Sequence, residues 1–247
     1  MEEKIKQLAN IIKEGNNIVF FGGAGVSTES GIPDFRSVDG LYGEEYDYPP
    51  EYIISHTFYK RNPKEFYRFY FDKMIFPNAP ANAAHIYLAD LEKRGKLRAV
   101  VTQNIDGLHQ KAGSKNVYEL HGSVLRNYCE KCAKFYSLDD ILTKTPYPVC
   151  DKCNGIIKPD VVLYEEGLPV DVLENSIKAI AKADVLIVGG TSLKVYPAAG
   201  LINYFNGDKL VIINKTPSPA DYQADLVING PIGEVFKTVS QIEKGEL

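Results

Sequence analysis

Residues 98–109 read RAVVTQNIDGLH, and this segment decides how the rest of the chain is interpreted. It begins with a β-like run, and polar side chains follow directly. A second apolar run, residues 117–120, ends just before His121. Polar residues that follow buried strands of an α/β protein lie at the carboxyl edge of the sheet, so we expect them to converge on one pocket. The four polar candidates are Gln103, Asn104, Asp106 and His121.

By itself the segment is also compatible with a simple connecting turn. Asn, Asp and Gly are the residue types most common in turns, and residues 104–107 contain all three. A binding pocket is the better interpretation only if other parts of the chain bring matching features to the same sheet edge.

Short apolar strands alternate with helical patterns along most of the chain. The strands lack polar alternation, which is typical of strands buried on both faces. This alternation predicts an α/β fold with a doubly wound parallel sheet. We expect strands at residues 17–21, 98–101, 117–120, 184–188, 210–213 and 224–228, and helices at residues 3–14, 62–70, 83–93 and 232–243, with another helix opened by Pro197.

A glycine-rich loop, GGAGVST at residues 22–28, follows the first strand. Glycines in this position let the backbone approach a pyrophosphate closely. Arg36 offers a bidentate phosphate donor and Phe35 a flat apolar wall, although Arg36 alone would equally suit a surface ion pair. Thr28 stands where hydride-transfer enzymes have glycine, and no acidic residue ends a following strand to hold a ribose. Both features count against an oxidoreductase.

Residues 37–78 are rich in Tyr and Phe and are interrupted by prolines. We predict a helical insertion that covers one side of the pocket, with its aromatic residues in a core rather than around a cofactor. Asn62 and Pro63 form a helix start. His56 and His85 have no partner visible in the sequence, and we interpret both as structural histidines.

All four cysteines lie in two C-x-x-C pairs separated by 17 residues: Cys129 with Cys132, and Cys150 with Cys153. This spacing is typical of a four-thiolate zinc site, which is closed and therefore structural. A nucleic-acid-binding zinc ribbon is the alternative. Basic residues only modestly outnumber acidic ones between residues 123 and 158, without a stripe of Lys or Arg interleaved with aromatics, so we consider it the weaker interpretation.

The composition excludes several classes of protein. The chain has 247 residues, 45% hydrophobic content and a net charge of -4, which suits a soluble globular protein without a broad cationic surface. The first residues carry charges of both signs, unlike a signal peptide, and no apolar stretch is long enough to span a bilayer. We therefore expect a cytoplasmic protein with neither a membrane partner nor a specific nucleic-acid partner.

Several motifs occur together and in a fixed order. They are GAGVS at residues 23–27, GIPDFR at 31–36, TQNID at 102–106, His121-Gly122, the paired C-x-x-C, and GTSL at 190–193. In this combination the chain resembles the sirtuins, which are NAD-dependent protein lysine deacylases, and the resemblance covers essentially its whole length.

The resemblance implies both an architecture and an activity of the bacterial deacetylase type. A Rossmann-like NAD-binding domain would comprise residues 1–36, 79–122 and 156–247, with the helical insertion at 37–78 and a zinc-binding module at 123–155. The implied enzyme transfers the acetyl group from protein lysine to ADP-ribose and releases nicotinamide and O-acetyl-ADP-ribose. NAD would be the co-substrate, one Zn²⁺ structural, and acetylated lysine-containing proteins or peptides the partners.

The resemblance also implies roles for individual residues. His121 would be the general base, and Asn104 with Ser27 would position the ribose and an ordered water. Ile105 and Asp106 would hold the nicotinamide amide. The NAD site would comprise Gly23, Ala24, Gly25, Ser27, Thr28, Phe35, Arg36, Gln103, Asn104, Ile105, Asp106, His121, Gly190, Thr191, Ser192, Asn214, Lys215 and Ile232. Val161, Leu163 and Tyr164 would contact the peptide, and Cys129, Cys132, Cys150 and Cys153 would bind the zinc.

The implied chemistry agrees with these residue types. Loss of nicotinamide leaves an oxocarbenium-like ribose carbon, so the site must exclude water and present the acyl oxygen as the nucleophile. A neutral imidazole can then take the proton of a ribose hydroxyl, which attacks the resulting imidate carbon. NAD is consumed without hydride transfer. Mono-ADP-ribosyl transfer would use the same carbon, and the sequence leaves it open.

Two positions depart from what sirtuins commonly show. The chain reads YEE at residues 164–166 where the family commonly has Phe-Gly-Glu. This segment would pair with the substrate as an added strand, and Glu165 narrows its backbone freedom and adds a negative charge that favours basic flanking residues. Sirtuins that remove succinyl groups carry Tyr-x-x-Arg, and Tyr67 and Tyr70 occupy those positions here. We therefore expect an apolar acyl channel suited to acetyl or longer neutral chains.

Overall fold

The main sheet has six parallel strands in the order β3-β2-β1-β7-β8-β9. The structure, a computed structural model, describes residues 1–34 and 48–247. The chain builds outward from β1 in one direction and then from β7 in the other, which confirms the predicted doubly wound parallel sheet. The strands are β1 (Ile18–Gly22), β2 (Leu97–Thr102), β3 (Val117–Glu119), β7 (Val185–Gly189), β8 (Lys209–Asn214) and β9 (Leu226–Asn229).

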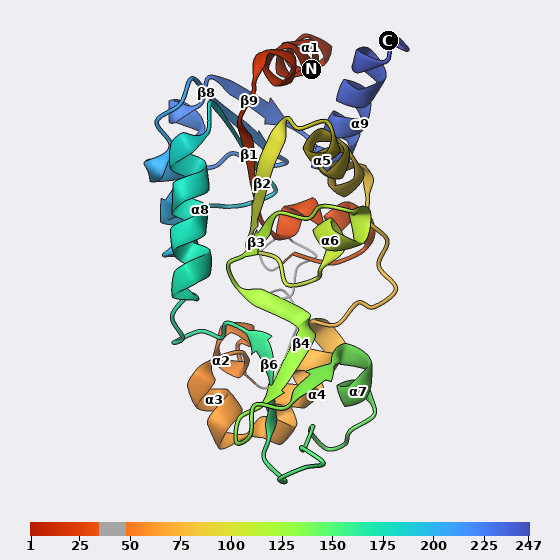
Figure 1. Ribbon diagram of the computed structural model, residues 1–247, viewed down its shortest axis with the longest axis vertical. Coiled ribbons are helices and arrows are strands. Elements are labelled where there is room, and N and C mark those ends of the chain that lie inside the picture. The colour runs from red at the N-terminus through yellow and green to blue at the C-terminus, as the bar shows by residue number, and fades with distance from the viewer. Residues whose placement is uncertain (35–47) are drawn as a thin grey trace.

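Neighbouring residues of the central strands pack into two different hydrophobic cores. Ile18 and Phe20 face one core, whereas Val19 and Phe21 face the other. Helices cover both faces, which explains why these strands are apolar throughout (Figure 1). One face carries α1 (Glu2–Glu14), α5 (Ala83–Lys93) and α9 (Ile232–Glu243), and the other carries α8 (Val170–Lys182) and η4 (Ala198–Tyr204).

The predicted helix ends agree closely with the structure in this part of the chain. Helix α5 begins where Asn82 accepts a hydrogen bond from the Ala84 amide, and His85 accepts one from the Asn82 amide in return. Because its side chain is buried and caps this helix, His85 is structural, as predicted. The segment after Pro197 is a 3-10 helix, whereas α8 was not predicted.

A second, smaller unit contains a three-stranded antiparallel sheet in the order β5-β4-β6. Short helices pack against this sheet and share one hydrophobic core with it, separate from the two cores of the main sheet (Figure 1, lower part). The described part of the helical insertion and the cysteine segment therefore form one body. Its elements are α2 (Pro50–Ile53), α3 (His56–Arg61), α4 (Pro63–Lys73), β4 (Gly122–Cys129), β5 (Phe135–Ser137), α7 (Leu138–Leu142) and β6 (Ile157–Val161).

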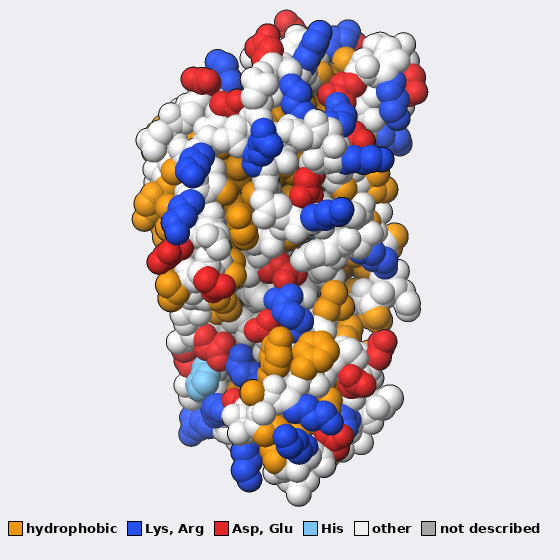
Figure 2. All heavy atoms as spheres, viewed as in Figure 1, with side chains coloured by type: hydrophobic (Ala, Val, Ile, Leu, Met, Phe, Trp, Pro, Cys, Tyr) orange, Lys and Arg blue, Asp and Glu red, His pale blue; other side chains and the backbone are white. Residues whose placement is uncertain are grey.

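Charges of both signs are interspersed on the surface. On the face drawn in Figure 2, Lys and Arg lie beside Asp and Glu rather than in one continuous basic area. In residues 1–34 and 48–247, each helix is too short or too polar to cross a membrane.

Candidate active site

A cleft of about 920 Å³ lies at the carboxyl ends of the main-sheet strands. Its walls include the loops after β1 and β7, where the strand order reverses, and it extends to the smaller unit. A reversal of strand order opens a crevice at the sheet edge, because the two flanking loops leave on opposite faces.

Within the described part of the chain, the cleft brings together the residues that the sequence predicts for the NAD and peptide sites. Phe35 and Arg36 lie outside the described residues. The cleft is lined by Gly23, Ala24, Gly25, Ser27, Thr28, Gln103, Asn104, Ile105, Asp106, His121, Val161, Leu163, Tyr164, Gly190, Thr191, Ser192, Asn214, Lys215 and Ile232.

The two glycine loops touch each other through their backbones. The Gly25 amide donates to the Gly190 carbonyl at 2.8 Å, and a Cβ added to Gly25 would lie only 2.8 Å from the Gly190 Cα. Gly190 also has φ +60°, which a residue with a Cβ rarely adopts. Any larger residue would separate the loops, so these glycines let a ligand lie directly against main chain. The Thr28 hydroxyl donates to the Gly25 carbonyl at 3.1 Å.

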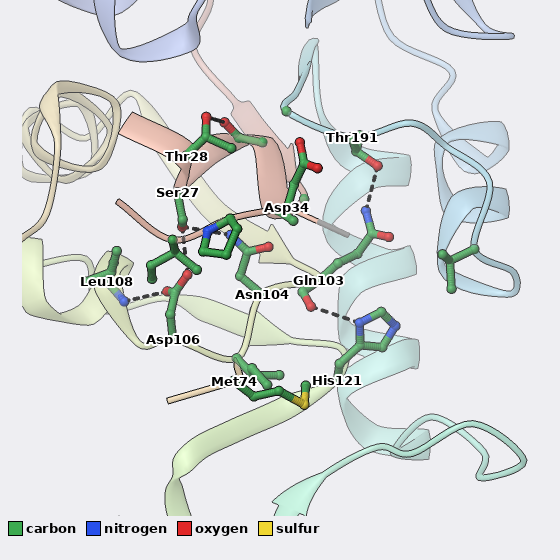
Figure 3. Close-up of a pocket in the computed structure, with 18 of the residues that line it drawn as sticks. Ser27, Thr28, Asp34, Met74, Gln103, Asn104, Asp106, Leu108, His121 and Thr191 are labelled. Carbon is green, nitrogen blue, oxygen red and sulfur yellow. Dashed lines mark hydrogen bonds between the residues drawn. The ribbon is translucent and has the colours of Figure 1, made fainter. Parts of the chain in front are cut away.

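Three polar side chains form a connected network at the back of the cleft (Figure 3). The Asn104 amide nitrogen donates to the Ser27 hydroxyl at 3.1 Å, and that hydroxyl donates to Asp106 at 2.7 Å. The other oxygen of Asp106 accepts from the Leu108 amide at 2.9 Å, at the start of α6 (Leu108–Ala112). These contacts fix each side chain before any ligand arrives, which is the requirement for a preorganised polar site.

A second network joins the loops after β2, β7 and β8. The Gln103 side chain donates to the Thr191 hydroxyl at 3.0 Å (Figure 3). Asn214 accepts from the Thr191 amide and donates to the Thr191 carbonyl, each at 3.0 Å. Asn214 thus satisfies both backbone groups of Thr191 and holds the loop after β7 against the sheet edge.

His121 lies between β3 and β4 with one ring nitrogen fixed. Its Nδ1 lies 2.8 Å from the Gln103 carbonyl oxygen (Figure 3). A carbonyl can only accept, so Nδ1 carries the proton and the neutral ring presents a lone pair at Nε2. Burial lowers the pKa of His121 below its ordinary value, opposed by the bond to Gln103, so the ring is neutral at pH 7. In the described part of the chain, Nε2 has no hydrogen-bond partner.

The residue after His121 must be glycine. Gly122 has φ +75°, and an added Cβ would lie 1.9 Å from the Asp160 carbonyl oxygen. The neighbouring Val162 amide donates to the His121 carbonyl at 3.0 Å. The strand pairing of β4 with β6 therefore holds the histidine backbone at the junction of the two units.

The wall on the side of the smaller unit is mostly apolar. Tyr67 and Tyr70 are fully buried in the core of the smaller unit and do not line the cleft. The Tyr67 hydroxyl donates to the Ile157 carbonyl instead. Their burial confirms the prediction that the aromatic residues of the insertion form a core, because α4 turns this face toward β6. The apolar wall comes from Ile54, Met74, Ile105, Val124, Val161 and Leu163.

Three residues that line the cleft were not predicted from the sequence. They are Lys194, Val195 and Tyr196. Their position after the glycine loop of β7 was the available signal, because residues there share its sheet edge. His56 also has an unforeseen partner: its Nδ1 lies 2.8 Å from Glu166.

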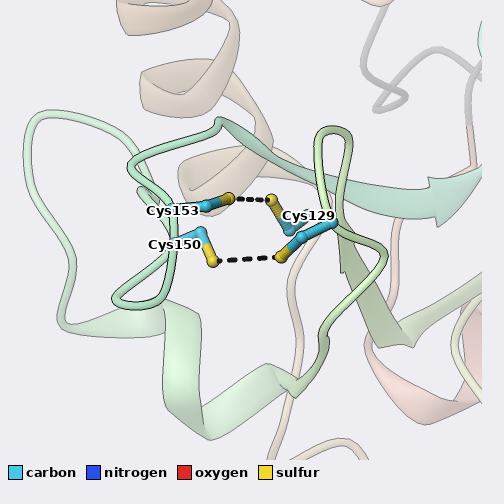
Figure 4. Close-up of side chains that lie close together, drawn as sticks. Cys129, Cys150 and Cys153 are labelled. Carbon is cyan, nitrogen blue, oxygen red and sulfur yellow. Dashed lines mark hydrogen bonds between the residues drawn. The ribbon is translucent and has the colours of Figure 1, made fainter.

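The four cysteines come together in the smaller unit, and Figure 4 labels Cys129, Cys150 and Cys153 among them. Their sulfur atoms all lie within 4.8 Å of one another, with Cys129 and Cys153 at 3.4 Å and Cys132 and Cys150 at 3.6 Å. Four sulfurs bound tetrahedrally about 2.3 Å from a zinc would lie about 3.8 Å apart, so the arrangement fits a four-thiolate zinc site.

The two cysteine turns have the same backbone form. Ala133 and Asn154, the residues after the two pairs, both have positive φ, and each amide donates to the carbonyl of the first cysteine of its pair. The Tyr136 hydroxyl donates to the Cys150 sulfur at 3.1 Å. Burial raises the pKa of the Cys150 thiol, but hydrogen bonds led by that of Tyr136 outweigh burial and set the pKa at about 6. The hydrogen bond that Tyr136 donates favours the thiolate form of Cys150, which is the form that binds zinc.

Comparison with known proteins agrees with this geometry. The model of the Sir2 family matches residues 23–197. A protein of Clostridium acetobutylicum named NAD-dependent protein deacetylase is 60% identical over 240 residues, or 96% of this chain and 98% of that protein. A solved Sir2 with a p53 peptide and NAD⁺ has a TM-score of 0.86 at 42% identity, covering 98% of this chain and 99% of the other.

A second similar solved structure contains a deacetylated peptide and an acetylated form of ADP-ribose. It is a Sir2 histidine-to-alanine variant with a deacetylated p53 peptide and 3′-O-acetyl ADP-ribose, and it has a TM-score of 0.89 at 41% identity, covering 98% of this chain and 99% of the other. Since the family model matches more than half of the chain and the relatives cover nearly all of it, the chain belongs to the Sir2 family.

Proposed function

We propose that this chain is an NAD-dependent protein lysine deacetylase that transfers the acetyl group to ADP-ribose and releases nicotinamide and O-acetyl-ADP-ribose. The observation that carries the proposal is His121, a neutral imidazole with Nδ1 fixed and Nε2 available, at a cleft whose other wall is a polar network. The name of the Clostridium relative and the ligands of the solved Sir2 structures support the same activity.

NAD would bind across the loops after β1, β2, β7 and β8. Where Gly25 and Gly190 contact each other, the absence of side chains lets the NAD phosphates lie directly against the main chain. The Asp106 carboxylate can accept hydrogen bonds from the nicotinamide amide. When bound, NAD supplies the ribose carbon to which the acyl oxygen adds. We propose that Arg36 and Phe35 complete this site. We also propose that residues 1–36, 79–122 and 156–247 form the NAD-binding domain beside the insertion at 37–78 and the zinc module at 123–155, with the correction that β6 (Ile157–Val161) pairs with β4 and belongs to the smaller unit.

His121 would act as the general base through Nε2. Because Nδ1 donates to the Gln103 carbonyl, the ring can take a second proton only at Nε2. Asn104 and Ser27, joined at 3.1 Å, would orient the ribose and an ordered water beside it. A base is effective when it is unprotonated near the working pH, and the lowered pKa of His121 meets this condition.

The peptide and the zinc would bind on the side of the smaller unit. Val161, Leu163 and Tyr164 would contact the acyl-lysine peptide as part of an edge that accepts an added strand. Cys129, Cys132, Cys150 and Cys153 would hold one Zn²⁺ with no open position, so the metal would be structural. We also propose that the protein works in the cytoplasm, where acetylated lysine-containing proteins would be its substrates.

The test is mass spectrometry of NAD with an acetylated peptide, using the native protein and His121→Ala. We expect O-acetyl-ADP-ribose from the native protein and a loss of at least about a hundredfold in the variant, the usual range for a removed general base. An unchanged melting temperature and zinc content in the variant would show that the loss is chemical.

Other outcomes would replace this function with a specific alternative. An ADP-ribosylated peptide without deacetylation would indicate mono-ADP-ribosyl transfer. The appearance of NADH would indicate an oxidoreductase. Full activity in His121→Ala would remove the histidine from the mechanism.

A further inference from the structure

The segment of residues 163–166 is fastened to the start of α3. The Tyr164 amide donates to the Ile54 carbonyl at 3.1 Å, and the His56 amide donates to the Tyr164 carbonyl at 3.0 Å. Glu165 continues this attachment through its side chain: one carboxylate oxygen accepts from the Thr57 hydroxyl at 2.6 Å and from the Thr57 amide at 2.9 Å. These hydrogen bonds hold the pKa of Glu165 below its usual value, as expected for a charge-assisted pair.

The backbone of Glu165 has a conformation that its side chain disfavours. Its φ is +76°, in the left-handed region that glycine adopts freely and residues with a Cβ do not. Sirtuins commonly have glycine at this position, which the backbone alone would favour here too. Since Glu165 has this left-handed conformation despite its Cβ, another interaction must compensate, and the hydrogen bonds of its own side chain to Thr57 supply one.

Glu165 also carries the backbone groups that are free to pair with a substrate. On either side of it, the Leu163 amide donates to the Glu166 carboxylate and the Glu166 amide donates to the Leu163 carbonyl. Within the residues that the structure describes, the amide and carbonyl of Glu165 have no partner. An added peptide strand would therefore find its open hydrogen-bonding groups at this residue.

We infer that Glu165 is a positioning residue for the acyl-lysine peptide: its carboxylate, bound to Thr57, holds the peptide-binding segment in the left-handed form that pairs with the substrate. This inference rests on the proposed deacetylase function. One carboxylate oxygen of the exposed Glu165 side chain is already bound to Thr57. A preference for basic residues beside the acyl-lysine should be the smaller effect.

Three substitutions at Glu165 separate attachment from charge and from backbone strain. Glu165→Gln keeps an oxygen that can accept from Thr57, so we expect a KM for the acetylated peptide within about twofold of native. Glu165→Gly removes the attachment and should raise this KM about fivefold, because only a fraction of the free segments remains competent to bind. Glu165→Ala removes the attachment without giving glycine's freedom, so its KM should be the highest. The kcat and the KM for NAD should not change.

A different ranking of the peptide KM values among these variants would contradict the inference. If strain alone mattered, Glu165→Gly would bind the peptide more tightly than native, and the other variants would resemble native. If charge alone mattered, the Gln, Gly and Ala variants would all show the same increase in peptide KM. That increase would occur only with peptides that carry basic flanking residues. Thr57→Val, which loses the hydroxyl but keeps the amide, should raise the peptide KM by about twofold.

Hydrogen exchange of the free protein tests the attachment without any activity. In Glu165→Gly, the amides of residues 162–167 and of Thr57 should exchange faster, while those of β7 and α9 stay unchanged. Unchanged exchange in the segment would overturn the inference. If the native protein makes no O-acetyl-ADP-ribose, the proposed function fails instead, and the exchange result still decides the attachment.

Discussion

The four cysteines of the candidate zinc site come from two short turns that lie 17 residues apart in sequence, whereas the cleft is lined by loops from Gly23 to Ile232. Each cysteine pair of this site is shaped by the backbone of its own turn, which has a left-handed residue directly after the pair. The cleft is open, and its side chains are held by contacts between distant loops, such as Gln103 with Thr191. The cysteine site stabilises the smaller unit, whereas the cleft keeps polar groups available to bind a ligand. Separate hydrophobic cores under the two sites suggest that each can be disturbed alone.

Loss of a cysteine should disturb the smaller unit far more than the main sheet. We expect Cys150→Ala to lose zinc and to unfold the smaller unit, because three thiolates leave the metal site open and structural zinc contributes folding free energy directly. Metal analysis together with hydrogen exchange tests this: protection should fall in β4, β5 and β6 and persist in β1 and β7. Equal loss in both sheets would show that the two units fold as one.

Acid should lower the free energy of unfolding through two buried histidines beside the main sheet. Burial lowers the pKa of His85 to about 4, against an ordinary value near 6.5, and places the pKa of His109 well below its ordinary value. The unfolded chain therefore binds protons that the folded chain does not, so stability is full above pH 6.5 and falls as the pH drops toward 4. For His85 the loss is about 3 kcal/mol.

Urea unfolding between pH 7 and pH 4 checks this expectation. The variant His109→Leu should show a smaller loss, because both ring nitrogens of His109 are buried without a partner among the described residues and an apolar side chain cannot take up the proton. A pH dependence equal to that of the native protein would mean that His109 does not contribute.

The acyl preference is the smallest expected difference. With Ile54, Val124 and Leu163 on the wall of the cleft near the smaller unit, a carboxylate on the acyl chain would be desolvated against apolar side chains. We expect kcat/KM for an acetyl-lysine peptide to exceed that for the matching succinyl-lysine peptide by at least about tenfold. Faster turnover of the succinyl peptide would contradict the apolar channel.

The parts of the fold that could be predicted are those with local signals. Asn62 and Pro63 begin α4 as predicted, and α5 and α9 have the predicted ends, because caps and apolar spacing act within one or two turns. Helix α8 was missed although Leu173, Ile177 and Ile180 have helical spacing and could have revealed it. The small sheet was missed because its strands pair across the cysteine turns, and this pairing depends on residues far apart in sequence.

The sequence by itself determined the parallel sheet, the grouping of its loop residues at one edge and the metal-ligating pattern, because strand burial, chain direction and cysteine spacing are local properties. Only the tertiary structure decided which core holds Tyr67 and Tyr70, since this depends on which face of α4 meets β6. It also decided that Glu165 reaches Thr57, 108 residues away in sequence. Such a contact exists only once separate elements are packed, and no local pattern encodes it.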